Sequence, residues 1–571
     1  MVHQLYYTLY TDLTKGDVKY VSDECWYVSS ARNMLYKYFG LKPNSIVNGK
    51  EYATVLCTSS TIRDEVSSFV ETVGGIILKI YDKQLRIGYP YALGVLMPIE
   101  YINELKSWNG VLIIEGYPYP DWNGITEYLN LEHPPLVKYI LCLTLLVKDN
   151  PVAWRIPSII AGALIIFFAY LIASKVFNSW IGVVAALSVA IEPVVRSMSL
   201  VAMLDIYVAL FSIISLYFTL AGRYYLAAVF IGLAGSSKMS GFFNSLALMI
   251  AGWRNLDRRR LLLCVIVIPA FVFFIINIPI IINEGGLINW INLLLWAIGW
   301  HTTSRPPNGP PVSNPWDWFI ARNPFPLHFS PDLYAMPSPF LMLLTLPLTA
   351  ILIPLALKAL RPGVGSILSW YWVPIGMYIL LYFIGNRTQY SFYTVHITPI
   401  AVLIVVSIVY LITDLNLLLK ILKTYLVEGN YRVPLFTCFG IILFIVISYL
   451  LPLFGVYRVL ISAIVATAVA ALMVENVKQK IIIGFITVSI GELIIVLIWL
   501  STAFEFITRL FTKFTFYALT PIMIAPLFGI LGSLIMMPAS KKVFSVIESL
   551  REKEEEVLDL RKMDEVNNDD N

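Results

Sequence analysis

Charged residues are scarce in this chain. Only 14% of its 571 residues are Asp, Glu, Lys or Arg, and 58% are hydrophobic, whereas soluble domains carry about 25% charged residues. The mean hydropathy of +0.74 agrees with that shortage. An ordinary soluble domain is thereby excluded. The net charge of +4 is mild and gives no sign of a nucleic-acid partner. We expect an integral, multi-pass membrane protein.

Long apolar runs recur from Ala153 onward, and each is about long enough to cross a hydrocarbon core of roughly 30 Å. Many of them end in Trp, Tyr, Lys or Arg, as anchors at the membrane interface do. The pattern predicts an all-α polytopic protein with about thirteen spans: 153–174, 180–195, 204–220, 224–235, 240–253, 261–282, 339–360, 366–384, 393–412, 434–453, 456–474, 481–502 and 517–537.

Basic residues fall mostly on alternate loops, and by the positive-inside rule those loops are cytoplasmic. The opposite, extracytoplasmic face then receives residues 1–150, residues 192–199, Lys238, the long loop 283–338 and residues 386–392. Nothing before Ala153 resembles a signal peptide or a full spanning helix. A first helix lost upstream is one explanation.

Cysteine and histidine are also rare, with five of each. No spacing among them matches a metal site, so we expect neither a metal nor a cofactor. Cys25 and Cys57 share the predicted outer face. A disulfide between them and two unpaired thiols are both open interpretations.

The chain divides into five predicted segments. Strand-like runs around a helical stretch predict a small α/β insertion on the outer face, and the lead-in before it resembles an amphipathic helix lying along the membrane surface. The segments are an external amphipathic segment at 1–40, the insertion at 41–130, a catalytic membrane domain at 131–412 that includes loop 283–338, C-terminal transmembrane helices at 413–540, and a charged cytoplasmic tail at 541–571.

Two polar motifs precede the membrane domain. Asp23 and Glu24 are adjacent, so on a helix they point about 100° apart and would have different roles. One could act as a general base, although a solvated surface pair is the competing interpretation. In Glu132-His133-Pro134-Pro135 the prolines would hold the two polar side chains at the membrane surface, or merely start a helix at Leu136.

Ionisable residues near the outer ends of apolar segments are costly and therefore functional candidates. Arg196, Asp205 and Lys238 lie there, and Arg387 precedes an aromatic cluster and His396. Cations at that depth suit a lipid phosphate, whereas snorkelling side chains are the alternative. The break at residues 235–241 favours a function for Lys238, because irregular backbone in a membrane is tolerated where it lines a cavity.

The order of these motifs resembles the protein O-mannosyltransferases of the GT-C glycosyltransferase class, in a form without the MIR module of eukaryotic members. The resemblance spans most of residues 20–400. It rests on the acidic pair and on further motifs in the family's order: His-Pro-Pro-Leu-x-Lys at 133–138, Trp-Arg-Ile-Pro-Ser at 154–158, Ala-Met-Leu-Asp at 202–205, Gly-Leu-Ala-Gly-Ser-Ser-Lys at 232–238, His301, and Ser-Asn-Pro-Trp-Asp-Trp at 313–318.

The resemblance implies an enzyme that transfers mannose or another hexose from a polyprenyl or dolichyl monophosphate to Ser or Thr of proteins, with inversion. It implies further that Asp23 is the catalytic base, that Glu24 binds on the acceptor side, and that four residues shape the cavity: Glu132, His133, His301 and Trp316. Arg196, Lys238 and Arg387 would bind the lipid phosphate, and Asp205 would be a structural residue of the cavity. Cations suffice to stabilise a monophosphate leaving group, so the mechanism requires no metal.

Three departures concern the substrate more than the reaction class. Leu200 stands where the family usually has Arg, and Arg196 is one helical turn earlier; Val137 replaces a usual glycine, and Pro310 a second histidine. A glycolipid acceptor, as in the aminoarabinose-transferring relatives, is therefore the main alternative. A transporter or scaffold is the non-enzymatic one, disfavoured because the polar residues gather on one face. A prokaryotic protein of this kind would lie in the cell membrane, with its active site outside; the oligomeric state stays open.

Overall fold

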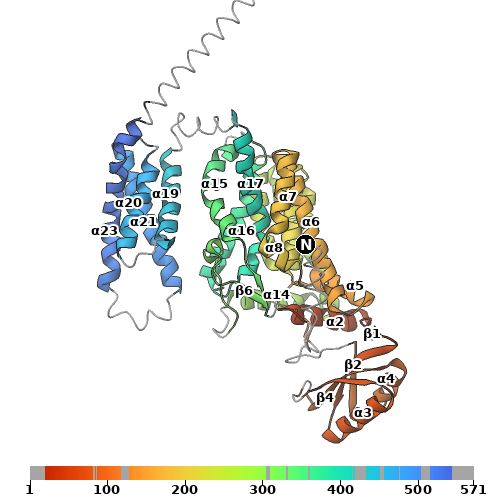
Figure 1. The fold of residues 1–571 in the computed structure, drawn as a ribbon. Helices are drawn as coiled ribbons and strands as arrows, with labels where there is room; N and C mark the ends of the chain where they lie inside the picture. Colours follow the sequence, from red (N-terminus) through yellow and green to blue (C-terminus); the bar gives the residue numbers. More distant parts are fainter. Residues whose placement is uncertain are drawn as a thin grey trace, which may run out of the picture. The chain divides into compact units, whose positions relative to one another are not determined.

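A computed structural model describes the chain over 20–81, 84, 87–116, 128–303, 309–329, 332–357, 361–414, 416–417, 432–450, 456–472, 474, 476–502, 515–542 and 545. The chain forms two compact units, residues 1–345 with 361–410 and residues 346–360 with 411–571. Each unit is mostly helical, which confirms the predicted all-α class with a small sheet (Figure 1).

The first unit holds the segments that carry the predicted motifs. Its helices before the long loop are α2 (Glu24–Phe39), α5 (Leu136–Val147), α6 (Pro151–Val176), α7 (Ser179–Ile191), α8 (Pro193–Met198), α9 (Asp205–Leu220), α10 (Tyr224–Ser237), η3 (Met239–Phe242), α11 (Phe243–Gly252), α12 (Arg258–Leu262), η4 (Leu263–Val267) and α13 (Ile268–Asn283). After them come α14 (Gly286–Thr302), η5 (Asp317–Ile320), β6 (Phe325–His328), β7 (Leu333–Ala335), α16 (Val364–Ile384) and η6 (Ser391–His396). Two further helices belong to this unit only in part: α15 (Pro339–Leu357) up to residue 345 and α17 (Thr398–Thr413) up to residue 410.

Membrane-crossing length is reached by fewer helices than the sequence predicts. In the described residues, three helices are long and apolar enough: Pro151–Val176, Arg258–Asn283 and Val364–Ile384. Other apolar helices there are shorter, such as α7 and α9. Breaks at Pro193 and around Lys238 divide the apolar runs, so the predicted number of about thirteen full spans is not confirmed.

The second unit contains α19 (Arg432–Leu450), α20 (Val456–Ala471), α21 (Val477–Thr502) and α23 (Thr515–Ile535). Two of these helices meet backbone to backbone: a Cβ added at Gly484 would lie 2.6 Å from the carbonyl oxygen of Gly529. Small residues at helix contacts are the usual means of close association in a membrane, where van der Waals packing drives it.

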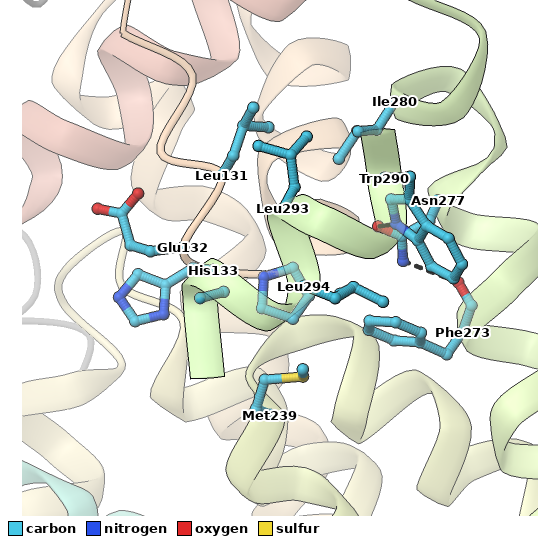
Figure 2. Close-up of a pocket in the computed structure, with 12 residues that line it drawn as sticks. Leu131, Glu132, His133, Met239, Phe273, Asn277, Ile280, Trp290, Leu293 and Leu294 are labelled. Atoms are coloured by element: carbon cyan, nitrogen blue, oxygen red, sulfur yellow. Dashed lines mark hydrogen bonds between the residues drawn. The ribbon is translucent and has the colours of Figure 1, made fainter. Parts of the chain in front are cut away.

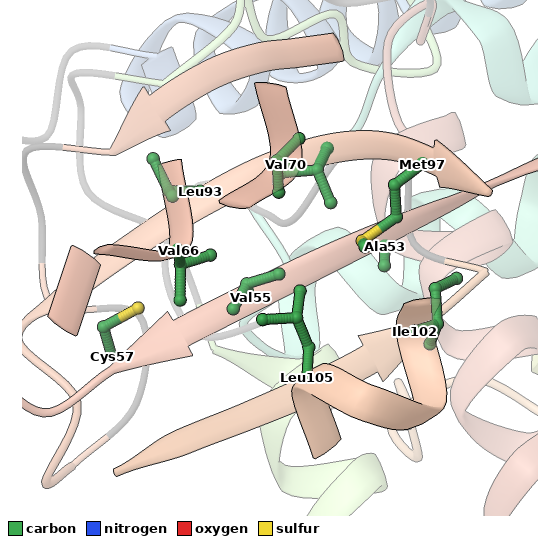
Figure 3. Close-up of a cluster of buried hydrophobic side chains, with 10 residues drawn as sticks. Ala53, Val55, Cys57, Val66, Val70, Leu93, Met97, Ile102 and Leu105 are labelled. Atoms are coloured by element: carbon green, nitrogen blue, oxygen red, sulfur yellow. The ribbon is translucent and has the colours of Figure 1, made fainter. Parts of the chain in front are cut away.

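The insertion folds as an antiparallel sheet with helices. Its elements are β1 (Ile46–Val47), β2 (Lys50–Cys57), α3 (Ser60–Thr72), β3 (Ile76–Tyr81), β4 (Tyr91–Pro98), α4 (Ile99–Lys106) and β5 (Val111–Glu115), with β2 between β4 and β5. Alternation places Val55, Leu93 and Met97 on one face, where side chains of α3 and α4 cover them (Figure 3). The strands at 52–56, 75–81 and 111–115 were predicted; β4 and α4 were not.

The thiol of Cys57 is part of this insertion core and is buried, whereas that of Cys25 is half-buried on α2. Neither cysteine forms a disulfide in the structure. Of the two interpretations of the sequence, the one without a disulfide is observed.

Helix α2 forms where the sequence predicts a helix, and it packs on other parts of the protein. Ten of its sixteen residues are buried, among them Glu24 and Arg32. Its main partner is α5, where the thiol of Cys142 donates to the carbonyl oxygen of Ala31 at 3.2 Å. The polar residues Glu24 and Arg32 therefore have protein partners, and a position of α2 at the membrane surface stays a prediction.

The long loop at 283–338 also contains more regular structure than predicted. Helix α14 occupies its first third, and β6 and β7 form a two-stranded sheet near its end. A helix was not predicted in this loop. The apolar residues of α14 are mostly exposed, Ile288 to 79%, so they do not mark one buried face of a helix.

The predicted break around Lys238 is confirmed. Helix α10 ends at Ser237, Lys238 is extended with φ −157° and ψ 140°, and η3 follows. Gly241 makes the turn back possible, because a Cβ there would lie 2.2 Å from the carbonyl carbon of Ala234. The extended residue aims the lysine side chain away from the helix axis.

Candidate active site

The two acidic residues have separate environments. Glu24 is fully buried, and its carboxylate accepts hydrogen bonds from Arg155 Nε at 2.7 Å and from Arg155 Nη2 at 2.6 Å. Its carboxylate also accepts the backbone N–H groups of Val21 and Ala202, each at 2.8 Å. Asp23 is only half-buried at the N-terminus of α2. The predicted division of roles is thus visible in the geometry, with Glu24 holding three segments together.

This geometry disagrees with an acceptor-side role for Glu24. Both of its oxygens are occupied by donors from the protein, and no part of the side chain is exposed. Asp23 is the more exposed member of the pair.

A second buried ion pair, which the sequence analysis missed, ties α2 to the start of α6. Arg32 donates to Asp149 at 2.6 and 2.7 Å, and the indole of Trp154 donates to the same carboxylate at 2.8 Å. The guanidinium lies 5.1 Å from the Trp154 ring, on which Tyr20 stacks at 5.2 Å. The only feature of the sequence that could have indicated this pair is Arg32 itself, which stands among the apolar residues of α2.

Lys238 and Asp205 form a closed ion pair, which the sequence did not predict. Lys238 Nζ donates to both Asp205 oxygens, at 2.8 and 3.0 Å. The Nε2 atom of His396 lies 3.0 Å from the same carboxylate, and its Nδ1 is 2.8 Å from the hydroxyl of Tyr378. His396 and Tyr378 belong to η6 and α16, far along the chain. Sequence reasoning had noted His396 beside Arg387 only.

The His-Pro-Pro segment is fixed by its own lysine. The ammonium of Lys138, fully buried, donates to the carbonyl oxygens of Leu129 (3.2 Å), Asn130 and His133 (2.8 Å). Helix α5 starts at Leu136, as predicted from the prolines. The lysine of this motif therefore shapes the loop that carries Glu132 and His133.

Three of the predicted cavity residues meet here. His301 on α14 has Nε2 2.9 Å from the carbonyl oxygen of Glu132, and its ring lies 4.9 Å from that of His133. Glu132 Oε1 accepts from Asn130 at 2.8 Å and from the hydroxyl of Tyr128. In the described part of the chain, the buried Oε2 atom of Glu132 has no hydrogen-bond partner.

A small, partly open hollow lies beside this cluster. Its walls are mostly apolar, with Glu132, His133 and Asn277 among them, and come from the Glu132 loop, η3, α13 and α14 (Figure 2). At one end Trp290 donates to Asn277 at 3.2 Å. Met239, which directly follows Lys238, lines it together with His133. The hollow thus joins the segment of Lys238 to that of His133.

The remaining predicted residues lie at different depths. Arg196 is half-buried on α8, which packs on η6, and its guanidinium has no hydrogen-bond or ion-pair partner among the residues the structure describes. Arg387 is exposed. Trp316 packs edge-on against Tyr382, with ring centroids 4.8 Å apart. Of the three cations predicted to bind phosphate, Lys238 is paired with Asp205, Arg196 is half-buried and Arg387 is exposed.

The loop of Trp316 is anchored by its neighbours. Trp318 donates to the carbonyl oxygen of Ser313 at 3.1 Å, and the N–H of Ser313 donates to that of Gln389 at 2.8 Å. Burial raises the pKa of Asp317 above its ordinary value of 3.8, although the N–H of Asn314 and the charge of Arg322 oppose the shift. No cluster of three or more metal-ligating side chains occurs in the described ranges.

The buried acid and cation clusters lie in one mostly helical unit. Residues 132–282 match the family model of the dolichyl-phosphate-mannose-protein mannosyltransferases. The match covers the Glu132 loop, Asp205 and Lys238, and over these residues it confirms the resemblance that the motifs indicated. Over this part of the chain the protein is similar to that family.

Solved structures give weaker similarities. ArnT from Cupriavidus metallidurans bound to undecaprenyl phosphate has a TM-score of 0.34 and 15% identity, over 73% of this chain and 68% of that one. The Archaeoglobus fulgidus oligosaccharyltransferase tethered with an acceptor peptide has a TM-score of 0.32 and 17% identity, over 65% of this chain and 48% of that one. The chain spans 66% of the length of apo ArnT. Among curated proteins, none matches the sequence significantly.

Proposed function

We propose that the protein transfers mannose, or another hexose, from a polyprenyl or dolichyl monophosphate to Ser or Thr of proteins on the extracytoplasmic face. The observation that carries this proposal is the bridge made by Glu24. Its carboxylate holds the N-terminus of α2 and accepts the N–H of Ala202, three residues before Asp205. The half-buried carboxylate of Asp23 and the Asp205–Lys238 pair are therefore held in fixed positions relative to each other.

Asp23 is the proposed general base. It is half-buried and directly precedes the immobilised Glu24, so its backbone has a fixed position while its side chain stays accessible. A carboxylate so placed can take the proton of an acceptor hydroxyl as that oxygen attacks the sugar. Attack from the side opposite the phosphate inverts the anomeric carbon.

Lys238, with Arg196, is the proposed site for the phosphate of the donor. Negative charge develops on the leaving phosphate, and preorganised cations in a poorly solvated site stabilise it strongly. Helix α8, which carries Arg196, and the side chain of Lys238 both approach η6. The chemistry then needs no metal.

The small hollow beside His133 is the proposed contact point for the remaining parts of the substrates. Its apolar walls suit isoprene units of the carrier, which enter at Met239, next to Lys238. At its rim, Glu132 Oε2 has no protein partner in the described part of the chain and can accept a hydrogen bond from a sugar or acceptor hydroxyl.

Transfer of labelled mannose from polyprenyl-phosphate-mannose to a Ser/Thr-rich peptide tests the proposal. Membranes with Asp23→Asn should lose at least about a hundredfold in rate, the usual value of a general base. Asp64→Asn, an exposed carboxylate of the insertion, is the matched control and should leave the rate unchanged. Undiminished transfer by Asp23→Asn removes Asp23 from the mechanism. Label found on lipid and never on peptide replaces the protein acceptor by a glycolipid.

A further inference from the structure

Four buried side chains from four segments, α9, the break at Lys238, η6 and α16, lie in sequence behind the proposed phosphate site. Lys238 contacts Asp205 on α9 through both carboxylate oxygens, Asp205 lies 3.0 Å from His396 Nε2, and His396 Nδ1 is 2.8 Å from the hydroxyl of Tyr378. Each of the three ionisable members is at most 7% exposed. The arrangement extends well beyond what a single ion pair requires.

Lys238 is fully engaged in this state. Besides its contacts to Asp205, its ammonium lies 4.0 Å from the centroid of the Tyr393 ring and 5.2 Å from that of Phe392. The faces of aromatic rings attract a cation without neutralising it. A donor phosphate that binds Lys238 must therefore compete with Asp205, whereas the two rings can keep the ammonium in place during the exchange.

His396 lowers the energy that such an exchange requires. A buried carboxylate that loses its only cation is strongly disfavoured, but Asp205 keeps His396 beside it when Lys238 turns to a phosphate. Nε2 of His396 lies 3.0 Å from Asp205 Oδ1 but is not aligned for a hydrogen bond within the described residues. A rotation of the ring would let Nε2 donate, and Nδ1 is then an acceptor in the neutral ring. The Tyr378 hydroxyl, 2.8 Å from Nδ1, can donate to it and is compatible with that tautomer.

We propose that Asp205 is an exchangeable counter-ion that holds Lys238 until a lipid phosphate arrives, and that His396 and Tyr378 are positioning residues that make the exchange possible. This inference rests on the proposed function, because it assigns the phosphate to Lys238. The ligand is a phosphate on a polyprenyl chain, and the recognised chemistry is its anionic head.

Binding of undecaprenyl phosphate to the full-length protein in detergent tests the inference, because the variants should shift the Kd in opposite directions. Asp205→Asn removes the competitor and should tighten binding about tenfold; His396→Leu leaves Asp205 dependent on Lys238 and should weaken it about tenfold. His396→Gln, which retains a donor, should recover much of the loss. A merely structural cluster would weaken binding in every case.

Tyr378→Phe is the mild variant and should weaken binding by a few-fold. Tyr371→Phe is its matched control, because this tyrosine is buried on the same helix but bonds Thr345 instead. If Asp205→Asn does not fold, Tyr378→Phe alone decides: a Kd equal to that of wild type and of Tyr371→Phe overturns the inference.

Lys238→Met separates this inference from the proposed function. Wild-type affinity in Lys238→Met refutes the assignment of the phosphate to Lys238, and with it both proposals. If Lys238→Met binds at least tenfold more weakly while Asp205→Asn fails to tighten binding, the phosphate site stands and the counter-ion exchange is refuted. In steady-state transfer, the variants should alter KM for the donor and leave KM for the acceptor peptide unchanged.

Discussion

Glu24 and Arg155 are 131 residues apart in the sequence, yet their side chains form a bidentate, fully buried ion pair with distances of 2.6 and 2.7 Å. The pair joins α2 to the first membrane-spanning helix. Because Asp23 directly precedes Glu24, the position of the proposed base depends on this contact.

Breaking that pair should destabilise the protein. Glu24→Gln leaves the guanidinium of Arg155 buried without its counter-charge, and removal of one partner of a buried pair typically costs about 3–5 kcal/mol. Thermal unfolding in detergent should show a clearly lower midpoint. Arg63→Gln, which breaks an exposed pair with Asp64, is the control and should not change the midpoint. An unaltered midpoint for Glu24→Gln would contradict the structural role given to this carboxylate.

A methyl group at Gly241 should disrupt the break that positions Lys238. The added Cβ would lie 2.2 Å from backbone atoms of Ala234, which cannot give way as a flexible side chain can. Gly241→Ala is therefore expected to cost about 1–3 kcal/mol and to reduce transfer activity. Gly376→Ala is the control, since nothing lies within 4 Å of a Cβ at that helical position. Equal activity of the two variants would show that the break tolerates displacement.

The stability of the loop around Asp317 should depend on pH. Burial raises the pKa of this carboxyl above its ordinary 3.8, so the folded state holds the proton more tightly than the unfolded state. The contribution to stability is complete below about pH 3.8 and is lost as the pH rises through the raised value.

Asp317→Asn should remove this dependence, because the amide oxygen can still accept the N–H of Asn314 without carrying a charge. Hydrogen exchange of the amides at 313–322, measured from pH 4 upward and corrected for intrinsic rates, compares the variant with wild type. A wild-type protection that rises with pH would mean that the charged form is the favoured one.

The insertion should lose stability when its core is truncated. Leu93 on β4 is fully buried among side chains of β2, α3 and α4. Leu93→Ala is therefore expected to lower the free energy of unfolding by about 2–5 kcal/mol. Faster hydrogen exchange of the amides in β2 and β4 would show this loss. Ile87→Ala, at a side chain 95% exposed, should leave those rates as they are. Unchanged exchange in Leu93→Ala would mean that this core does not hold the strands.

The sequence by itself determined the features that depend on local pattern. Low charge and long apolar runs define a membrane protein, alternation and turn residues predict three of the strands, and the prolines after His133 predict the start of α5. The irregular stretch at Lys238 also follows from local sequence, because it separates two apolar segments that are too short for one continuous helix. The order of the motifs along the chain is a property of the sequence as well, and the family match over residues 132–282 agrees with it.

Only the tertiary structure decided which charges are paired. Glu24 with Arg155, Arg32 with Asp149, and Asp205 with Lys238 and His396 all join residues from different elements. Composition cannot distinguish a buried pair from a free ion, because the partner of a buried charge is chosen by packing between distant segments. For that reason Glu24 changes from a candidate ligand into a structural residue, and Lys238 from a free cation into one held by a counter-ion.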